Sequence, residues 1–145
     1  MKTILVADDA PDVLALACEI LAADGYTVLT ATNGEEALRL AERHPGPIHA
    51  LLADVVMPRL NGPQLADRLA RSRGSMKVIF MSGYTSEITG AYGLVPSGAP
   101  FVGKPFTPEQ LLLRVRAALD YRSPFGRPAP AIPSQASMAL ARKAV

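Results

Sequence analysis

The residues best able to do chemistry in this chain stand directly after short apolar runs. They are three carboxylates, one hydroxyl and one ammonium group: Asp8, Asp9, Asp54, Ser82 and Lys104. Carboxylates that lie close together raise one another's pKa unless a cation lies between them. A set of oxygen ligands without His or Cys suits a hard ion, Mg²⁺ or Mn²⁺ in its place. With a lysine for the anion and a serine as a directional donor, such a site would let an aspartate attack a phosphoryl group.

These side chains can meet only if the runs before them are neighbouring strands of one sheet. The predicted strands are Thr3–Ala7, Val28–Ala31, Ile48–Ala53, Lys77–Met81 and Pro100–Gly103. Nearly continuous apolar runs are typical of strands buried on both faces of a parallel sheet. In the order 2-1-3-4-5, strands one, three, four and five are contiguous, and their carboxyl ends form one pocket. The fold class is therefore α/β, a doubly wound, flavodoxin-like sheet between two helical layers.

Capping signals mark where the helices between these strands begin. Asn33 and Asn61 are each followed three residues later by Glu or Gln, and Thr107 with Gln110 forms a complete capping box before Pro108. Pro11 opens the first helix.

Apolar stripes indicate which helix faces are buried. The expected stripes are Leu14, Cys18 and Leu21 in the first helix and Leu112, Val115 and Leu119 in the last. Cys18 is interpreted as a small core side chain. The fourth helix is expected to be short and irregular, about residues 86–92, because glycines and a proline surround it.

Composition separates one domain from a tail. The chain has 145 residues, 49% of them hydrophobic and 19% charged, as in ordinary globular domains. Residues 1–121 carry 11 basic and 13 acidic side chains, whereas the Pro/Ala-rich residues 122–145 carry 4 basic and no acidic ones. A single cysteine excludes disulfide and zinc-finger scaffolds. The absence of a signal sequence and of a long apolar run predicts a cytoplasmic protein without a membrane partner.

Longer motifs carry a family resemblance. The segments that match are ILVADDAPD from residue 4, NGEEAL from residue 33, DVVMPRLNG from residue 54, FMSGYT from residue 80 and FVGKPF from residue 101. Over residues 2 to about 121 the chain resembles a receiver domain of bacterial two-component response regulators. The segments MSGYT from residue 81 and KPF from residue 104 are similar to those of receivers in hybrid histidine kinases and in single-domain regulators.

The resemblance implies roles for individual residues in phosphoryl transfer. Asp54 would be the phosphoacceptor and Lys104 the lysine that pairs with the phosphate. Asp9 would bind Mg²⁺ directly and Asp8 mainly through water. Val56 would offer its backbone carbonyl to the metal.

The same resemblance implies a conformational switch and residues that tune the lifetime of the phosphorylated state. Ser82 matches the switch hydroxyl and Phe101 the aromatic switch position. Val56 and Tyr84, each two residues beyond a site residue, would set the rate of phosphate loss. The bond between Lys104 and Pro105 would be cis.

At the level of the whole protein, the resemblance implies phosphorelay signal transduction. A sensor histidine kinase or a histidine phosphotransfer protein would supply the phosphoryl group, and phosphorylation would change partner binding. The chain would not be an enzyme beyond its own phosphorylation and dephosphorylation. A homodimer through the face of the fourth helix, fifth strand and fifth helix is one assembly to test. Since Met1 stands just ahead of the first strand, a stand-alone receiver is favoured over a fragment of a kinase.

Three other classes compete with this interpretation. A haloacid-dehalogenase-like phosphohydrolase would need a second acid two residues after its nucleophile, where Val56 stands. A flavin-binding module would place its phosphate where Asp8 and Asp9 repel it. A phosphorylation-independent interaction module would not need the complete set of acids, hydroxyl and lysine. The 24 residues after the domain are too few for a DNA-binding output domain. The two histidines, His44 and His49, are expected in surface and core roles and not in phosphotransfer.

Overall fold

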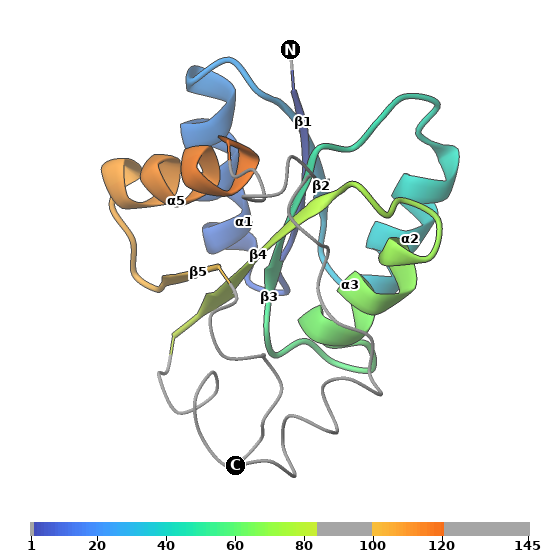
Figure 1. Ribbon diagram of the computed structural model, residues 1–145. Coiled ribbons are helices and arrows are strands. Elements are labelled where there is room, and N and C mark those ends of the chain that lie inside the picture. Colours follow the sequence, from blue (N-terminus) through green and yellow to red (C-terminus); the bar gives the residue numbers. More distant parts are fainter. Residues whose placement is uncertain (1, 84–99, 121–145) are drawn as a thin grey trace, which may run out of the picture.

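The computed structural model describes residues 2–83 and 100–120, which form one α/β sheet domain (Figure 1). The elements in chain order are β1 (Thr3–Ala7), α1 (Pro11–Ala23), β2 (Thr27–Ala31), α2 (Gly34–Arg43), β3 (Ala50–Asp54), α3 (Gly62–Ala70), β4 (Lys77–Ser82), β5 (Phe101–Gly103) and α5 (Pro108–Asp120). The predicted fourth helix, Tyr84 and residues 122–145 lie outside the described residues.

The sheet has the predicted order β2-β1-β3-β4-β5, and every strand pair is parallel. Helices α1 and α5 cover one face, and α2 and α3 cover the other (Figure 1). All carboxyl ends of the strands therefore lie on one edge, as the predicted site requires.

Strand boundaries differ slightly from the prediction, and the differences matter at the site. Strand β3 includes Asp54 and β4 includes Ser82, so these residues end their strands instead of following them. Strand β3 also begins later than predicted, at Ala50. Just before it, the backbone N–H of Thr3 donates to Nδ1 of His49 at 2.9 Å, taking a donor that a longer ladder would use. His49 is half-buried and bonds to the backbone, whereas a core role in a strand was expected for it.

Each face of the sheet has its own hydrophobic core, because side chains alternate along a strand. Leu5, Leu51 and Phe80 pack under α2 and α3, whereas Leu52 and Ile79 pack under α1 and α5. Burial on both faces explains the nearly continuous apolar runs.

The helix starts largely confirm the capping predictions. Asn61 and Gln64 form a reciprocal box with bonds of 2.8 and 2.9 Å. Thr107 and Gln110 do the same at 3.1 and 2.9 Å. At α2 only half of a box forms: the Asn33 side chain accepts from the Glu36 N–H, but the Glu36 carboxylate accepts from the residue before the cap.

The buried helix faces are rotated slightly from the predicted stripes. In α1, Ala17 and Ile20 are buried beside Leu14 and Leu21, and Cys18 is half-buried, so its assignment to the core was wrong. In α5 the buried residues are Leu111, Val115 and Ala118. Both predicted leucines, Leu112 and Leu119, are only half-buried. These helices pack against the sheet and against each other, so the buried arc is set by two neighbours.

No helix among residues 2–83 and 100–120 is long and apolar enough to cross a membrane.

Candidate functional site

Backbone hydrogen bonds fix the ends of the strands that carry the candidate site. Just beyond β3, the N–H of Val55 donates to the Met81 carbonyl of β4 at 2.9 Å. Just beyond β5, the N–H of Lys104 donates to the Ser82 carbonyl at 2.8 Å. The strand ends are thus tied to one another, so the side chains they carry have fixed origins.

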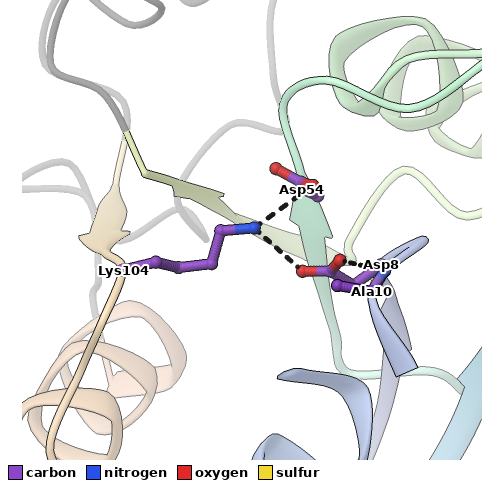
Figure 2. A network of polar contacts seen from close by, with 4 residues as sticks. All are labelled: Asp8, Ala10, Asp54 and Lys104. Atoms are coloured by element: carbon purple, nitrogen blue, oxygen red, sulfur yellow. Dashed lines mark hydrogen bonds and ion pairs between the residues drawn. The ribbon is translucent and has the colours of Figure 1, made fainter. Parts of the chain in front are cut away.

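A lysine joins two carboxylates across this edge of the sheet. Figure 2 shows Nζ of Lys104 between Asp8 and Asp54. The nitrogen lies 3.2 Å from Oδ2 of Asp8 and 3.3 Å from Oδ2 of Asp54. The second oxygen of Asp8 accepts from the Ala10 N–H at 2.8 Å, which holds the carboxylate in place. Asp8 is fully buried and Asp54 is 6% exposed. The peptide bond after Lys104 is cis, as predicted.

Asp9 completes a group of three carboxylates with ligand oxygens within 4.8 Å of one another. Unlike Asp8 and Asp54, Asp9 is exposed. The donors are all carboxylate oxygens, and a hard cation that keeps some of its waters accepts such a set. The residues present therefore fit Mg²⁺.

The net pKa shifts of the two central groups, Asp54 and Lys104, are both upward, although burial acts on them in opposite directions. Burial first, and then the charge of Asp8, raise the pKa of Asp54 from 3.8 to about 6, although Lys104 works against this shift. Burial lowers the pKa of the Lys104 ammonium, but Asp54 and Asp8 outweigh it and the net pKa is raised. Near neutral pH, Asp54 is therefore mainly an ionised and relatively basic carboxylate beside a fixed ammonium group, which suits a nucleophile.

The remaining predicted residues surround this centre. Ser82 is buried at the end of β4, the strand next to Asp54. Val56, two residues beyond the acid, is 50% exposed. Phe101 lies on β5 opposite Phe80 and is 36% exposed. Tyr84 falls outside the described residues.

Sequence reasoning missed two backbone partners of the site. The N–H of Ala10 orients Asp8, and the N–H of Gly62 donates to the Val55 carbonyl at 3.0 Å. An Asp two residues before the N-cap of a helix is a recognisable signal for the first. The second contact joins the end of β3 to the start of α3. No sequence signal reveals it, because it depends on how α3 packs in the folded chain.

The fold and the site define a class of protein. It is a doubly wound α/β domain whose cluster of three acids, two of them paired with a lysine, lies at the carboxyl ends of β1, β3 and β5. The family model described as response regulator receiver domain matches residues 4–116. The chain therefore belongs to the response regulator receiver domain family and is a receiver domain of two-component signalling.

Relatives of known name agree with this assignment. The chain is 32% identical over 127 residues to the response regulator GtcR of Aneurinibacillus migulanus, a match that covers 88% of this chain and 51% of GtcR. It is 33% identical over 118 residues to the sensor kinase CckA of Brucella abortus, covering 81% of this chain and 12% of CckA. The chain thus spans about half of one relative and a small part of the other.

Solved structures have the same fold. The receiver domain of the hybrid histidine kinase CckA is 36% identical, with a TM-score of 0.66 over 81% of this chain and 99% of that one. A response regulator receiver domain protein from Clostridium thermocellum is 25% identical, with a TM-score of 0.70 over 83% and 95% of the two chains. Membership of this family excludes the phosphohydrolase and flavin-binding interpretations.

Proposed function

We propose that this domain accepts a phosphoryl group on Asp54, in a reaction that needs Mg²⁺, and thereby changes its binding to a partner. The donor is a sensor histidine kinase or a histidine phosphotransfer protein. The observation that carries the proposal is the buried Asp54 carboxylate, paired with Lys104 and crowded by two further acids. This arrangement combines a nucleophile, a metal site and an anion partner within one pocket.

The nucleophile is the ionised Asp54 carboxylate. One of its oxygens attacks the phosphorus of the donor as the bond from phosphorus to the donor's histidine nitrogen breaks, and that nitrogen keeps the electron pair. The product is an acyl phosphate on Asp54 and a free imidazole on the donor. Without a bound cation the pKa of Asp54 is raised to about 6, so the carboxylate is mainly ionised at neutral pH, and a bound Mg²⁺ would favour the ionised form further.

The acids Asp8, Asp9 and Asp54, with the backbone carbonyl of Val56, would hold Mg²⁺. When bound, the ion supplies positive charge that offsets the repulsion between these carboxylates and the incoming phosphoryl oxygens.

Lys104 and Ser82 act on the transferred group. The Lys104 ammonium is shared between Asp8 and Asp54. Once Asp54 has become an acyl phosphate, a mixed anhydride without the carboxylate charge, the ammonium pairs with a phosphoryl oxygen. The Ser82 hydroxyl, on the strand next to Asp54, donates to a second oxygen. Movement of Ser82 toward the phosphoryl group, followed by Phe101 on the adjacent strand, is the change that a partner would sense.

Further proposals concern the role of the whole chain. The chain catalyses only its own phosphorylation and dephosphorylation and acts in the cytoplasm. Residues 1–121 act as the receiver, and residues 122–145 form an appended basic tail. A homodimer through the face of the predicted fourth helix, β5 and α5 is a further proposal. Neither nucleic acid nor a membrane is a direct partner.

The experiment that tests the proposal is labelling by a small phosphodonor. The protein is incubated with acetyl phosphate and Mg²⁺, and its intact mass is compared before and after. One phosphoryl group is expected, and removal of Mg²⁺ by a chelator should abolish the gain. Asp67→Asn is the matched control, because Asp67 is a buried acid on α3 outside the pocket. Asp54→Asn labelled as fully as this control would contradict the assignment.

A further inference from the structure

The start of α3 lies unusually close to the backbone of Asp54. Gly62 is the first residue of α3, and a Cβ atom placed on it would lie 2.3 Å from the Asp54 carbonyl oxygen. The same atom would lie 3.1 Å from the Asp54 carbonyl carbon and 3.2 Å from the Cα of Val55. All three neighbours are backbone atoms, which cannot rotate out of the way. Only a hydrogen atom fits at this position.

The requirement is for space and not for an unusual backbone conformation. Among the described glycines only Gly25 has a positive φ, of 96°. Gly62 follows the N-cap Asn61 in an ordinary helix start, where an alanine would otherwise be accepted. The glycine therefore serves the contact with Asp54.

This contact completes a clamp on one peptide group, the one that joins Asp54 to Val55. Its N–H donates to the Met81 carbonyl of β4 at 2.9 Å. Its oxygen packs against the Cα of Gly62. The next carbonyl, that of Val55, accepts from the Gly62 N–H at 3.0 Å. The peptide that follows the phosphoacceptor is thus held by β4 on one side and by α3 on the other.

The helix start that presses on this peptide is itself fixed. The reciprocal bonds between Asn61 and Gln64 hold the first turn of α3, and Gly62 and Pro63 are buried. The direction in which the Asp54 side chain leaves the backbone depends on that peptide plane. Its carboxylate must reach Lys104 at 3.3 Å, so a small tilt of the peptide moves it out of the pocket.

We propose that Gly62 is a positioning residue that aims the Asp54 carboxylate at the metal and phosphoryl site, an inference that rests on the proposed function. A side chain at position 62 forces the start of α3 away from β3 or tilts the peptide after Asp54. In either case the three carboxylates no longer converge, and Mg²⁺ affinity falls by more than the loss of stability explains.

The test compares Gly62→Ala with Leu69→Ala by calorimetric titration with Mg²⁺. Leu69 is a buried residue of the same helix, so its truncation destabilises α3 without touching Asp54. Urea unfolding curves fix a temperature at which both variants are folded. Gly62→Ala should bind Mg²⁺ about 10- to 100-fold more weakly, as is typical when the support of a ligand is lost. Leu69→Ala should bind as the parent does, and equal affinities in the two variants would overturn the proposal.

A milder pair of variants keeps the test valid if Gly62→Ala does not fold. Asn61→Ala and Asn33→Ala each remove an N-cap side chain, at a typical cost of ~1 kcal/mol. Only the first loosens the helix start that presses on Asp54. Weaker Mg²⁺ binding in Asn61→Ala alone supports the positioning role, whereas equal binding in both contradicts it.

A parent protein that binds no Mg²⁺ would contradict the proposed function instead. The positioning role is then decided by the carboxyl ¹³C resonance of Asp54. It should move in Gly62→Ala and stay in place in Leu69→Ala, and an unmoved resonance in both would overturn the proposal.

Discussion

The ammonium nitrogen of Lys104 lies 3.3 Å from the carboxylate of Asp54 and is at the same time 3.2 Å from Asp8. One cation therefore serves two buried acids that would otherwise repel each other. Lys104 balances only part of the negative charge, because a carboxylate oxygen of Asp9 also lies within 4.8 Å of the carboxylate oxygens of Asp8 and Asp54. This residual negative charge is what a bound divalent cation would neutralise.

Removing the lysine should make Asp54 harder to ionise. In Lys104→Met, the pKa of Asp54 should rise above its parent value of about 6, because burial and Asp8 then act without an opposing cation. The carboxyl ¹³C resonance of Asp54, followed against pH in the presence of a chelator, measures this directly. Lys2→Met removes an exposed lysine and serves as the control. An unchanged Asp54 titration in Lys104→Met would show that the ion pair does not control this pKa.

Asp54 should also make stability depend on pH when the metal is removed. Its pKa is raised from 3.8 to about 6, so the folded state holds the proton more tightly than the unfolded state. Stability from this group is present below about pH 4 and is lost as the pH rises toward 6 and above. In a chelator at pH 7, Asp54→Asn should be more stable than the parent by up to ~3 kcal/mol.

Urea unfolding of the two proteins at pH 3.5 and at pH 7 is the measurement. The difference between them should shrink toward zero at the lower pH, where Asp54 is protonated in both states. Added Mg²⁺ should stabilise the parent more than the variant at pH 7. A parent that is at least as stable as Asp54→Asn at pH 7 without metal would refute the argument.

Val56 should slow the loss of phosphate from Asp54. It lies two residues beyond the acid, is 50% exposed and offers no group that could orient a water. In Val56→Asn, one hydrogen bond to the attacking water, worth ~1 kcal/mol, should speed hydrolysis about fivefold. The decay of phosphorylated protein after removal of the donor gives the rate. Leu113→Asn, at an apolar position on α5 that is 65% exposed, is the control, and equal decay in both variants would show that Val56 does not shield the phosphate.

Arg73 should stabilise the opposite end of the domain. Its guanidinium donates to the carbonyls of Ala41, His44 and Gly46 at 2.8, 3.0 and 3.0 Å, which closes the end of α2. Arg73→Ala should lower the free energy of unfolding by ~1–3 kcal/mol, because charged donors make the stronger hydrogen bonds. Arg68→Ala, an exposed neighbour on α3, should change it little. Phosphorylation of Asp54 should be unaffected in both, since neither residue reaches the pocket.

The strands and the residues at their ends could be predicted because both depend on local signals, whereas the sheet order was assumed from doubly wound topology and is confirmed by the structure. Apolar runs mark buried parallel strands, and the residue that ends each run must lie at the edge where the ligand binds. The acids Asp8 and Asp54 and the basic Lys104 were found in this way. The rotation of a helix is less local, which is why Cys18 was placed in the core where Ala17 packs.

Contacts that depend on two distant segments were beyond the reach of sequence patterns. Nothing in the motif that ends at Gly62 reveals that its Cα lies against the Asp54 carbonyl, because that distance is set by the packing of α3 on β3. In the same way, a lysine has a long and flexible side chain, so its bridge between two carboxylates is fixed only in the folded pocket.

The most direct test of the proposed function is to locate the phosphoryl group. The protein is phosphorylated with acetyl phosphate and Mg²⁺, the acyl phosphate is reduced with borohydride, and the peptides are analysed by mass spectrometry. Reduction converts a phosphorylated aspartate to homoserine. Homoserine is expected at position 54, with unchanged aspartates at positions 8 and 9. Homoserine at either of those positions, or none at position 54, would contradict the proposed function.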